Sequence, residues 1–209
     1  MGWSGWKGWK MFLALDSDIL MYKAASAAEK EVDWGDDVWS LQTDLKEAKA
    51  AFEYQITKIT DRLGVKDYVC CLSDHKANFR KVVDPSYKSN RKGTRKPVGY
   101  VALCDWVEAN FKRFRKDRME ADDCLGLIST KPGNEGKVIM VSDDKDLKTI
   151  PGKLYRPMAD ELLTITEADA DKHFFTQVLT GDATDGYKGV PGIGPKKAEA
   201  ILGARPHWG

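Results

Sequence analysis

Residues 12–18 read Phe12-Leu13-Ala14-Leu15-Asp16-Ser17-Asp18, a short apolar run that ends in acidic residues. Two later stretches have the same form: residues 68–74 end in Ser73-Asp74, and residues 138–144 end in Ser142-Asp143-Asp144. Continuous apolar runs of this length are typical of parallel strands covered on both faces. The carboxyl ends of parallel strands share one edge of a sheet, where open α/β folds place their sites. The sequence therefore predicts an α/β fold with carboxylates gathered along that edge.

Two further acidic groups lie outside these strands. Glu120-Ala121-Asp122-Asp123 opens a predicted helix, and Asp182 and Asp185 stand three residues apart before a segment rich in Gly and Lys. Carboxylates this close together repel one another unless a cation holds them. Hard divalent cations prefer oxygen ligands, and two-metal phosphodiesterases use several carboxylates. The acidic groups together indicate a metal-dependent site.

Each acidic group also has an ordinary structural explanation. An Asp after a strand is often a turn former or a helix N-cap. Acids in a first helical turn interact favourably with the helix dipole, so the group at 120–123 alone could be capping. We interpret Asp18 as a helix cap and Asp143 as a loop residue. The whole set is hard to explain in this way, which favours the metal site.

Two segments have the chemistry to contact nucleic acid. The loop Gly192-Ile193-Gly194 can bring backbone N–H groups against a phosphate, because glycine adds no side-chain bulk. Between residues 76 and 96 there is a single acid, Asp84, among eight basic residues: Lys76, Arg80, Lys81, Lys88, Arg91, Lys92, Arg95 and Lys96. Blocks of like charge are often simply solvated, but this block follows a strand tipped by a carboxylate. Tyr87 within it could stack on a base or pack against Val83.

The ordered motifs resemble those of the 5′-nuclease (flap endonuclease) superfamily, and most of all the 5′→3′ exonucleases of short-tailed bacteriophages. The resemblance covers roughly residues 12–203. Its motifs are Leu15-Asp16-Ser17-Asp18, Ser73-Asp74, Tyr87-Lys88-x-x-Arg91, Lys96-Pro97-Val98-Gly99-Tyr100, Met119-Glu120-Ala121-Asp122-Asp123, Asp144-Lys145-Asp146 and Gly181-Asp182-x-x-Asp185.

This resemblance implies a PIN-like α/β core, in which helices flank a central, mostly parallel sheet, with a basic helical arch and a C-terminal helix–three-turn–helix. Residues 11–175 would form the nuclease core, with the arch at 76–97, and residues 176–209 the DNA-binding region. Residues 1–10, rich in Trp and Lys, would be an N-terminal extension or a cloning remnant. The family usually continues with more helices, so the short end after residue 203 indicates a compact version or a truncated C-terminus.

The resemblance also implies residue roles. The first metal would be held by Asp16, Asp74, Glu120 and Asp122. The second would be held by Asp123, Asp144, Asp146, Asp182 and Asp185. Lys88 and Arg91 would contact the scissile phosphate. The other DNA-binding residues would be Arg80, Tyr87, Lys92, Gly192, Ile193, Gly194, Lys196 and Lys197.

The implied cofactors are two Mg²⁺ ions, for which Mn²⁺ could substitute, and K⁺ is a candidate ligand of the helix–three-turn–helix. The implied reaction is hydrolysis of DNA phosphodiesters at a 5′ end, a flap or a single-strand/double-strand junction, giving 5′-phosphate and 3′-OH products. RNA·DNA hybrids are a further candidate substrate. The alternatives are a non-catalytic protein that binds DNA structures through the helix–three-turn–helix, and a PIN-type endoribonuclease, which would lack the hairpin.

Composition agrees with these expectations. The chain has 33 Lys and Arg against 32 Asp and Glu, a formal charge of +1. Without the nine proposed ligands there are 33 basic and 23 acidic residues, a balance of +10, which suits a DNA-binding surface. Four cysteines without a Cys-x-x-Cys pair indicate a reducing cytoplasm, that of a bacterial host if a phage encodes the chain. No apolar stretch is long enough to span a bilayer. The oligomeric state stays open.

Periodicity and cap signals predict the elements between the motifs. Residues 18–29 and 38–63 are expected to be helical, with an acidic loop at 31–37 between them. A helix is expected near 98–115 and ends in the basic run up to Arg118. Thr166 is expected to cap a helix that starts at Glu167. A helical hairpin is expected at 187–203.

Overall fold

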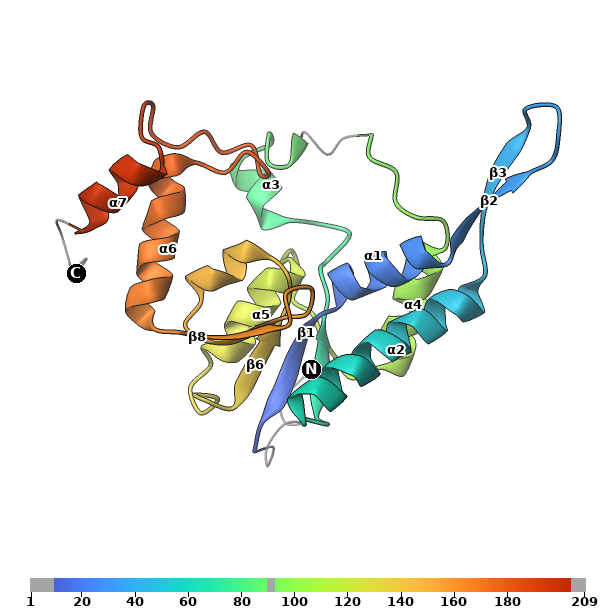
Figure 1. The fold of residues 1–209 in the computed structure, drawn as a ribbon, viewed down its shortest axis with the longest axis horizontal. Helices are drawn as coiled ribbons and strands as arrows, with labels where there is room; N and C mark the ends of the chain where they lie inside the picture. The colour runs from blue at the N-terminus through green and yellow to red at the C-terminus, as the bar shows by residue number, and fades with distance from the viewer. Residues whose placement is uncertain (1–9, 90–92, 204–209) are drawn as a thin grey trace.

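In the computed structural model, which describes residues 10–89 and 93–203, the first strand of the chain lies inside a six-stranded sheet (Figure 1). The strand order is β5-β4-β1-β6-β7-β8. These strands are β1 (Phe12–Asp16), β4 (Tyr68–Cys71), β5 (Arg113–Phe114), β6 (Val138–Val141), β7 (Gly152–Arg156) and β8 (Glu161–Ile165). The helices are α1 (Ser17–Ala27), α2 (Leu45–Leu63), α3 (Phe79–Val83), α4 (Tyr100–Asn110), α5 (Ala121–Ser129), the 3-10 helix η3 (Lys145–Thr149), α6 (Glu167–Thr180) and α7 (Pro195–Gly203).

The three strands predicted from their acidic ends are direct neighbours. β1 pairs in parallel with β4 on one side and with β6 on the other. The register places Asp16 opposite Cys71 and Leu15 opposite Val141. The acidic residues that follow these strands therefore emerge at the same edge, as predicted. Of the sheet's pairings, only that of β7 with β8 is antiparallel.

Alternate side chains of the sheet enter two separate cores. Leu13 and Leu15 pack in a cluster with residues of α1, α2 and α4, whereas Phe12 and Ala14 pack in a cluster with α5. Neighbouring residues of a strand point to opposite faces, which also separates Cys70 from Cys71. All four cysteines are buried, and none of them forms a disulfide. Two covered faces explain why the strands read as continuous apolar runs.

Local sequence signals fix the helix ends where they are strong. α2 buries Ala48, Phe52, Ile56 and Ile59, a stripe at helical spacing. It ends at Leu63, and Gly64 caps it with a φ of +64°, in the left-handed region that favours glycine. α6 starts at Glu167 as expected. Thr166 caps it by accepting a hydrogen bond from the backbone N–H of Asp169.

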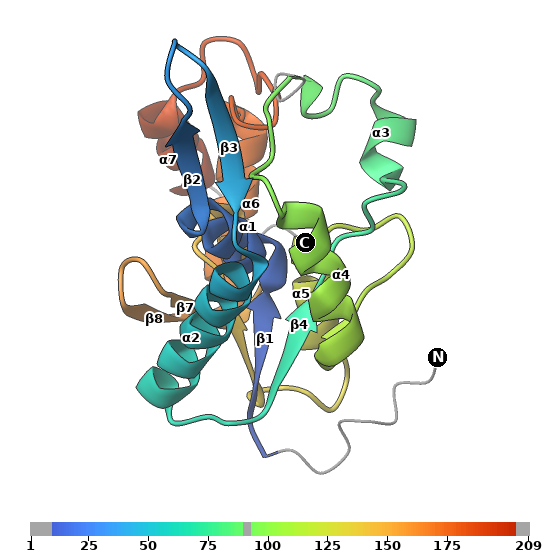
Figure 2. The ribbon, with the colours of Figure 1, turned by 90° about the vertical axis from the view of Figure 1, so that its right-hand side faces the viewer.

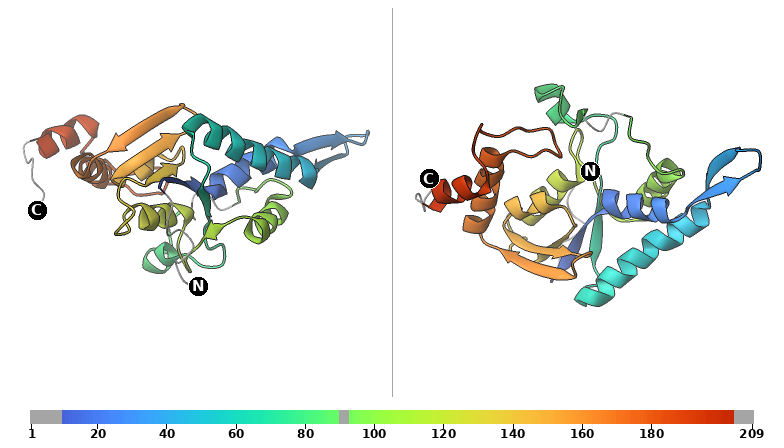
Figure 3. Two further views of the ribbon diagram at one scale, coloured as in Figure 1. Left: turned by 90° about the horizontal axis from the view of Figure 1, so that it is seen from below. Right: turned by 45° about the horizontal axis from the view of Figure 1, so that its top comes forward.

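The expected helix from residue 38 begins only at Leu45, because the residues before it form a strand. β2 (Glu29–Asp33) and β3 (Trp39–Thr43) make an antiparallel hairpin of their own. Figures 2 and 3 show this hairpin projecting away from the main sheet. Trp, Leu and Thr at alternate positions of β3 favour a strand, and Asp44 then supplies the N-cap of α2.

The helix expected near 98–115 is also shorter. α4 ends at Asn110, and residues 113–114 form β5 at the edge of the sheet, so the basic run there does not close a helix. Phe111 turns inward against Phe52 and Trp106, which fixes the end of α4. Positive charge on an edge strand discourages pairing with another chain. Strands β7 and β8 were not expected from the sequence.

Two segments stand above the carboxyl edge of the sheet. The first is the basic segment, which contains α3; residues 85–88 after it form a turn, with Lys88 at a φ of +53°. Arg91 and Lys92 lie outside the described residues. The second segment is α6, the loop 181–194 and α7. Across the described part of the chain, every helix is too short or too polar to cross a bilayer.

Candidate active site

Asp16 lies at the end of β1 and is 5% exposed. Its Oδ2 accepts a 2.7 Å hydrogen bond from the hydroxyl of Ser142, which follows β6. The pKa of Asp16 is raised to about 7, chiefly by burial; the hydrogen bond from Ser142 opposes this rise, and the nearby charges of Asp18 and Asp122 add to it. A buried carboxylate with acidic neighbours is a place where a cation would be stabilised.

The neighbours of Asp16 correct the prediction for Asp18. Asp16 itself is the N-cap of α1 and accepts from the backbone N–H of Ile19. Asp18 lies in the first turn and accepts from the backbone N–H of Ser73, which joins α1 to the end of β4. Asp143 receives the Lys23 amine at 2.6 Å and the backbone N–H of Met158, so it ties three segments together.

The group at the start of α5 combines capping with charge. Asp123 accepts from the backbone N–H of Glu120 at 2.9 Å, so the capping explanation is correct for this residue. Asp123 also receives two hydrogen bonds of 2.7 Å from the guanidinium of Arg80, which is 3.2 Å from Glu120. Burial, followed by the charges of Glu120 and Asp123, raises the pKa of Asp122 to about 6.

The basic segment reaches this group through its side chains. The Tyr87 hydroxyl lies 2.8 Å from Oε2 of Glu120 and 3.3 Å from Oδ2 of Asp185. The Lys88 amine donates to Oε1 of Glu120 at 3.0 Å and is 4.0 Å from Asp185. Two cations lie near the Tyr87 ring, Lys88 at 4.9 Å and Arg80 at 5.7 Å from its centroid. Figure 1 shows the C-terminal loop beside this segment.

A second group surrounds the end of β6. Asp144 caps η3 and accepts from the backbone N–H of Asp146 at 2.9 Å. The Lys145 amine bridges two carboxylates, that of Asp146 at 2.8 Å and that of Asp182 at 2.5 Å. The hydrogen bond from Lys145 lowers the pKa of Asp182. The loop after α6 is thereby held against the sheet edge.

Two glycines shape that loop. Gly181, at a φ of +83°, and Gly189, at +64°, touch each other's backbone. A Cβ at Gly189 would lie 2.3 Å from the nitrogen of Gly181, a contact that no side chain tolerates. The loop can therefore fold back on itself only with glycine here, which holds Asp182 and Asp185 near the core.

Asp74 has a different role in the structure. One of its oxygens accepts from the backbone N–H of Lys76 at 3.0 Å and the other from that of Arg118 at 2.8 Å. These backbone hydrogen bonds lower the pKa of Asp74, so the residue stays ionised. Its oxygens order the loops after β4 and before α5, as the turn-former explanation predicts.

Contacts connect the other eight predicted ligands in small sets. Asp16 interacts electrostatically with Asp122, and Ser142 connects Asp16 to the backbone of Asp144. Arg80 joins Asp123 to Glu120, Tyr87 joins Glu120 to Asp185, and Lys145 joins Asp146 to Asp182. Within residues 10–89 and 93–203, the described side chains include no ready-made group of three or more metal ligands. Positively charged side chains pair with these carboxylates instead: Arg80, Lys88 and Lys145. Asp16, which is buried, and Asp122, which is half-buried, have raised pKa values, and other carboxylates of the set pair with Lys and Arg. Such a set of oxygen donors suits hard divalent ions.

The residues predicted to contact DNA at the C-terminal end lie in one loop and in the start of the helix that follows it. Gly192 has a φ of +76°, and a Cβ placed on Gly192 or Gly194 would meet nothing within 4 Å. The surface there is open to a ligand, and Ile193 between them is half-buried. Lys196 and Lys197 lie exposed in the first turn of α7, and the Lys197 amine donates to the carbonyl of Gly192 at 3.0 Å.

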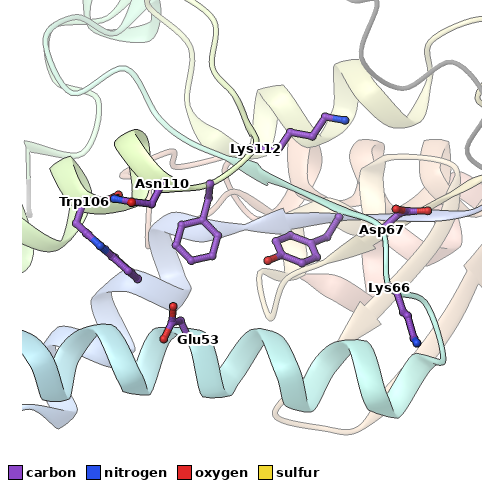
Figure 4. Close-up of a pocket in the computed structure, with 8 residues that line it drawn as sticks. Glu53, Lys66, Asp67, Trp106, Asn110 and Lys112 are labelled. Carbon is purple, nitrogen blue, oxygen red and sulfur yellow. The ribbon is translucent and has the colours of Figure 1, made fainter.

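A hollow of about 480 Å³ lies at the opposite edge of the sheet, before β4 and β5. Figure 4 shows Glu53 of α2, Trp106 of α4 and Lys112 around it. The predicted ligands follow the strands at their carboxyl ends, so this hollow is separate from them. The candidate site lies instead along the carboxyl edge of the sheet, where the loops that carry these ligands meet.

Two residues of the site were missing from the sequence predictions. Ser142 is 3% exposed and connects Asp16 with the backbone of Asp144. Lys145 lay inside a recognised motif but received no role. A serine directly after a strand carries no distinctive signal, whereas a lysine between two aspartates is a signal that could have been used.

This arrangement agrees with the comparisons to known proteins. The family model described as 5′-3′ exonuclease, N-terminal resolvase-like domain, matches residues 11–178. The chain belongs to the 5′-3′ exonuclease family. Among its curated relatives in this family is the exodeoxyribonuclease of Enterobacteria phage T3, 37% identical over 92% of this chain and 66% of the relative. The exonuclease of Escherichia phage T7 is 36% identical over 88% of this chain and 64% of the relative. The chain thus spans about two thirds of the length of these relatives.

Solved structures share the fold. A crystal structure of the T5 D15 protein co-crystallised with metal ions has a TM-score of 0.68 and 18% identity, covering 94% of this chain and 75% of that one. A complex of the T5 D15 flap endonuclease with DNA and metal ions has a TM-score of 0.69 and 17% identity, with the same coverage. The α/β core with its mostly parallel sheet, predicted from the strand ends, is therefore confirmed.

Proposed function

We propose that this chain is a divalent-metal-dependent nuclease that hydrolyses DNA phosphodiesters from a 5′ end or at a flap. One observation carries the proposal: acidic residues that follow β1 and β6, start α5 and occupy the loop after α6 are linked at one edge of the sheet. The raised pKa values of Asp16 and Asp122 and the contacts of their neighbours with Lys and Arg support a site for positive charge at this edge. The kinship to phage exonucleases supports the same reading.

Magnesium is the ion that this donor set favours, because all the donors are hard carboxylate oxygens. A pair of ions would be held by Asp16, Asp74, Glu120 and Asp122 on one side and by Asp123, Asp144, Asp146, Asp182 and Asp185 on the other. Asp74, with both oxygens on backbone N–H groups, is the weakest member of this set. Bound Mg²⁺ supplies a water of lowered pKa and stabilises charge on the leaving oxygen. Mn²⁺ satisfies the same oxygen donors.

Basic side chains of the protein would contact the DNA. Lys88 already lies among the carboxylates, where its amine could stabilise charge on the scissile phosphate together with Arg91. Arg80, Tyr87 and Lys92 would position the strand end. We assign residues 11–175 to the nuclease core and residues 176–209, with the loop 192–194, Lys196 and Lys197, to duplex binding as a helix–three-turn–helix. K⁺ would bind at that loop, and RNA·DNA hybrids would be accepted as well as DNA.

A duplex labelled at its 5′ end tests this function directly. Incubation with Mg²⁺ is expected to release short labelled fragments with 3′-OH ends, and EDTA is expected to stop the release. A flap substrate and an RNA·DNA hybrid of the same sequence compare the substrate classes. Tight binding without cleavage under all metal conditions would instead favour a non-catalytic protein that binds DNA structures.

A further inference from the structure

The side chains proposed to bind DNA form hydrogen bonds with the carboxylates proposed to bind the metal. Arg80 binds Asp123 through two hydrogen bonds of 2.7 Å, and Lys88 binds Glu120 at 3.0 Å. Tyr87 lies 2.8 Å from Glu120 and 3.3 Å from Asp185. These three residues span nine positions of one segment, and their partners belong to two others. We refer to this set of contacts as the latch.

The contacts of the latch connect three parts of the molecule. α3 and the turns after it come from the basic segment, Glu120 and Asp123 from the start of α5, and Asp185 from the loop after α6. The side chains of Lys88 and Glu120 are 19% and 18% exposed, and that of Arg80 is 28% exposed. Charge-assisted hydrogen bonds in such half-buried positions are stronger than those of surface pairs.

Apolar packing contributes little to holding this segment in place. Val82 and Val83 of α3 are 70% and 81% exposed, and Phe79 is 37% exposed. Lys88 adopts a φ of +53°, a left-handed conformation that costs a lysine free energy. Polar contacts with the carboxylates therefore carry much of the segment's attachment. A segment held mainly in this way is released when its partners are taken.

The same carboxylates would serve both purposes only poorly at once. A divalent ion coordinated by Glu120, Asp123 or Asp185 would repel the positive charges of Arg80 and Lys88. It would also compete with the hydrogen bonds of the latch for the lone pairs of these carboxylates. An amine bound to Glu120 is likewise withheld from a phosphate. Metal binding and the latch therefore compete, and each shifts the equilibrium of the other.

We propose that Arg80, Tyr87 and Lys88 fasten the basic segment to the metal-binding carboxylates while no ion is bound, and that divalent cations release it for DNA. This inference rests on the proposed function for the identity of the ion site. In the metal-free protein, the side chains that would bind phosphate would stay paired with carboxylates of the same chain. It would also bind its metal more weakly than the bare carboxylates allow.

Tyr87→Phe is the sharpest test, because it removes one hydroxyl without changing charge. Mn²⁺ binding to the DNA-free protein, followed by electron paramagnetic resonance, is expected to be at least about threefold tighter in this variant, since the apparent affinity scales with the population of the open form. Lys88→Met is expected to have a larger effect. Lys81→Met, on the exposed side of α3, is the matched control for loss of a charge and is expected to leave Mn²⁺ affinity close to that of the wild type.

Hydrogen exchange of the peptide covering residues 79–89 reports the release itself. Saturating Mg²⁺ is expected to speed exchange there in the wild type, with the same midpoint as metal binding. Saturation with unchanged exchange, or weaker Mn²⁺ binding by Tyr87→Phe, would overturn the latch even if the protein cleaves DNA. Release of the segment by metal in a protein that never cleaves would keep the latch and overturn the proposed function.

Discussion

The hydroxyl of Ser142 donates a 2.7 Å hydrogen bond to the carboxylate of Asp16, although 126 residues separate the two. The same oxygen accepts from the backbone N–H of Asp144. Ser142→Ala would leave one oxygen of a buried carboxylate without its donor. We expect a loss of about 1–3 kcal/mol in the free energy of unfolding and a higher Mg²⁺ concentration for half-maximal cleavage. Urea titration and cleavage assays measure the two effects.

The chain offers a matched control for that variant. The hydroxyl of Ser129 is buried at the end of α5 and has no hydrogen-bond partner among the described residues. Ser129→Ala is therefore expected to be neutral or slightly stabilising and to leave cleavage unchanged. Equal behaviour of the two alanine variants would show that the Ser142 hydroxyl does not position Asp16.

Asp122→Asn combined with Asp144→Asn is expected to abolish cleavage yet keep duplex binding. Both changes remove charge from proposed metal ligands and leave the C-terminal loop and its lysines intact. Release of a 5′ label measures cleavage, and fluorescence anisotropy measures binding. Asp143→Asn is the control, because Asp143 pairs with Lys23 and lies next to the site without belonging to it. Wild-type cleavage by the double variant would refute the ligand assignment.

Lys88→Ala is expected to slow turnover far more than it weakens affinity for duplex DNA. Its amine lies among the carboxylates, where it would act on charge that develops during the reaction. Single-turnover rates and equilibrium binding on the same substrate separate the two quantities. An equal loss of both would make Lys88 a positioning contact only.

Lys196→Ala is expected to weaken DNA binding at every sequence tested. If Lys196 neutralises one phosphate, the slope of log affinity against log salt should fall by about 0.9. Lys30→Ala serves as the control, because that amine pairs with Glu47 beside the β2–β3 hairpin. An unchanged slope for Lys196→Ala would remove this residue from the DNA contact.

Glu29 gives a prediction about acid stability. Its carboxylate receives the Arg95 guanidinium at 2.7 Å and the backbone N–H of Val98 at 2.6 Å. These contacts lower its pKa from 4.5 to about 2. A lowered folded-state pKa stabilises the fold above the unfolded value, and this stabilisation disappears as the pH falls from about 4.5 to 2.

Glu29→Gln isolates that contribution. Urea unfolding is expected to show the variant less stable than the wild type at pH 6, with a difference that shrinks steadily towards pH 2. Glu31→Gln, two residues further along β2 on the exposed strand, is the control and is expected to show no such trend. A difference that stays constant with pH would mean that the amide disturbs packing and that charge is not the cause.

Local patterns in the sequence were enough to predict part of this molecule. Apolar runs ending in Asp16 and Asp144 predicted adjacent parallel strands, because such runs need two covered faces. Thr166 followed by acids gave the start of α6. The strand at 39–43 was missed, since an alternating pattern beside a strong helical stripe can be assigned to either. β7 and β8 were missed because antiparallel pairing at a sheet edge depends on neighbours that are distant in sequence.

In the candidate site too, the sequence predicted some features, and others could be seen only in the structure. The acidic motifs stood out because each occupies a short stretch of sequence. Lys145 bridging Asp146 and Asp182, and Tyr87 joining Glu120 to Asp185, depend on how loops cross in space. When a Lys or Arg lies near several acidic residues in the sequence, the sequence does not predict which of them it pairs with. These pairings therefore needed the structure.

The place of β1 inside the sheet has a consequence for synthesis on the ribosome. β1 is made among the first residues described, but its partner β6 is made far later, with Leu15 opposite Val141. At roughly 5–20 residues per second, one side of this apolar strand stays open for roughly 6–25 s of translation. Asp16 acquires Ser142 only when that gap closes. The nascent chain must therefore keep Phe12 to Leu15 from contact with neighbouring chains on the polysome until β6 has been made.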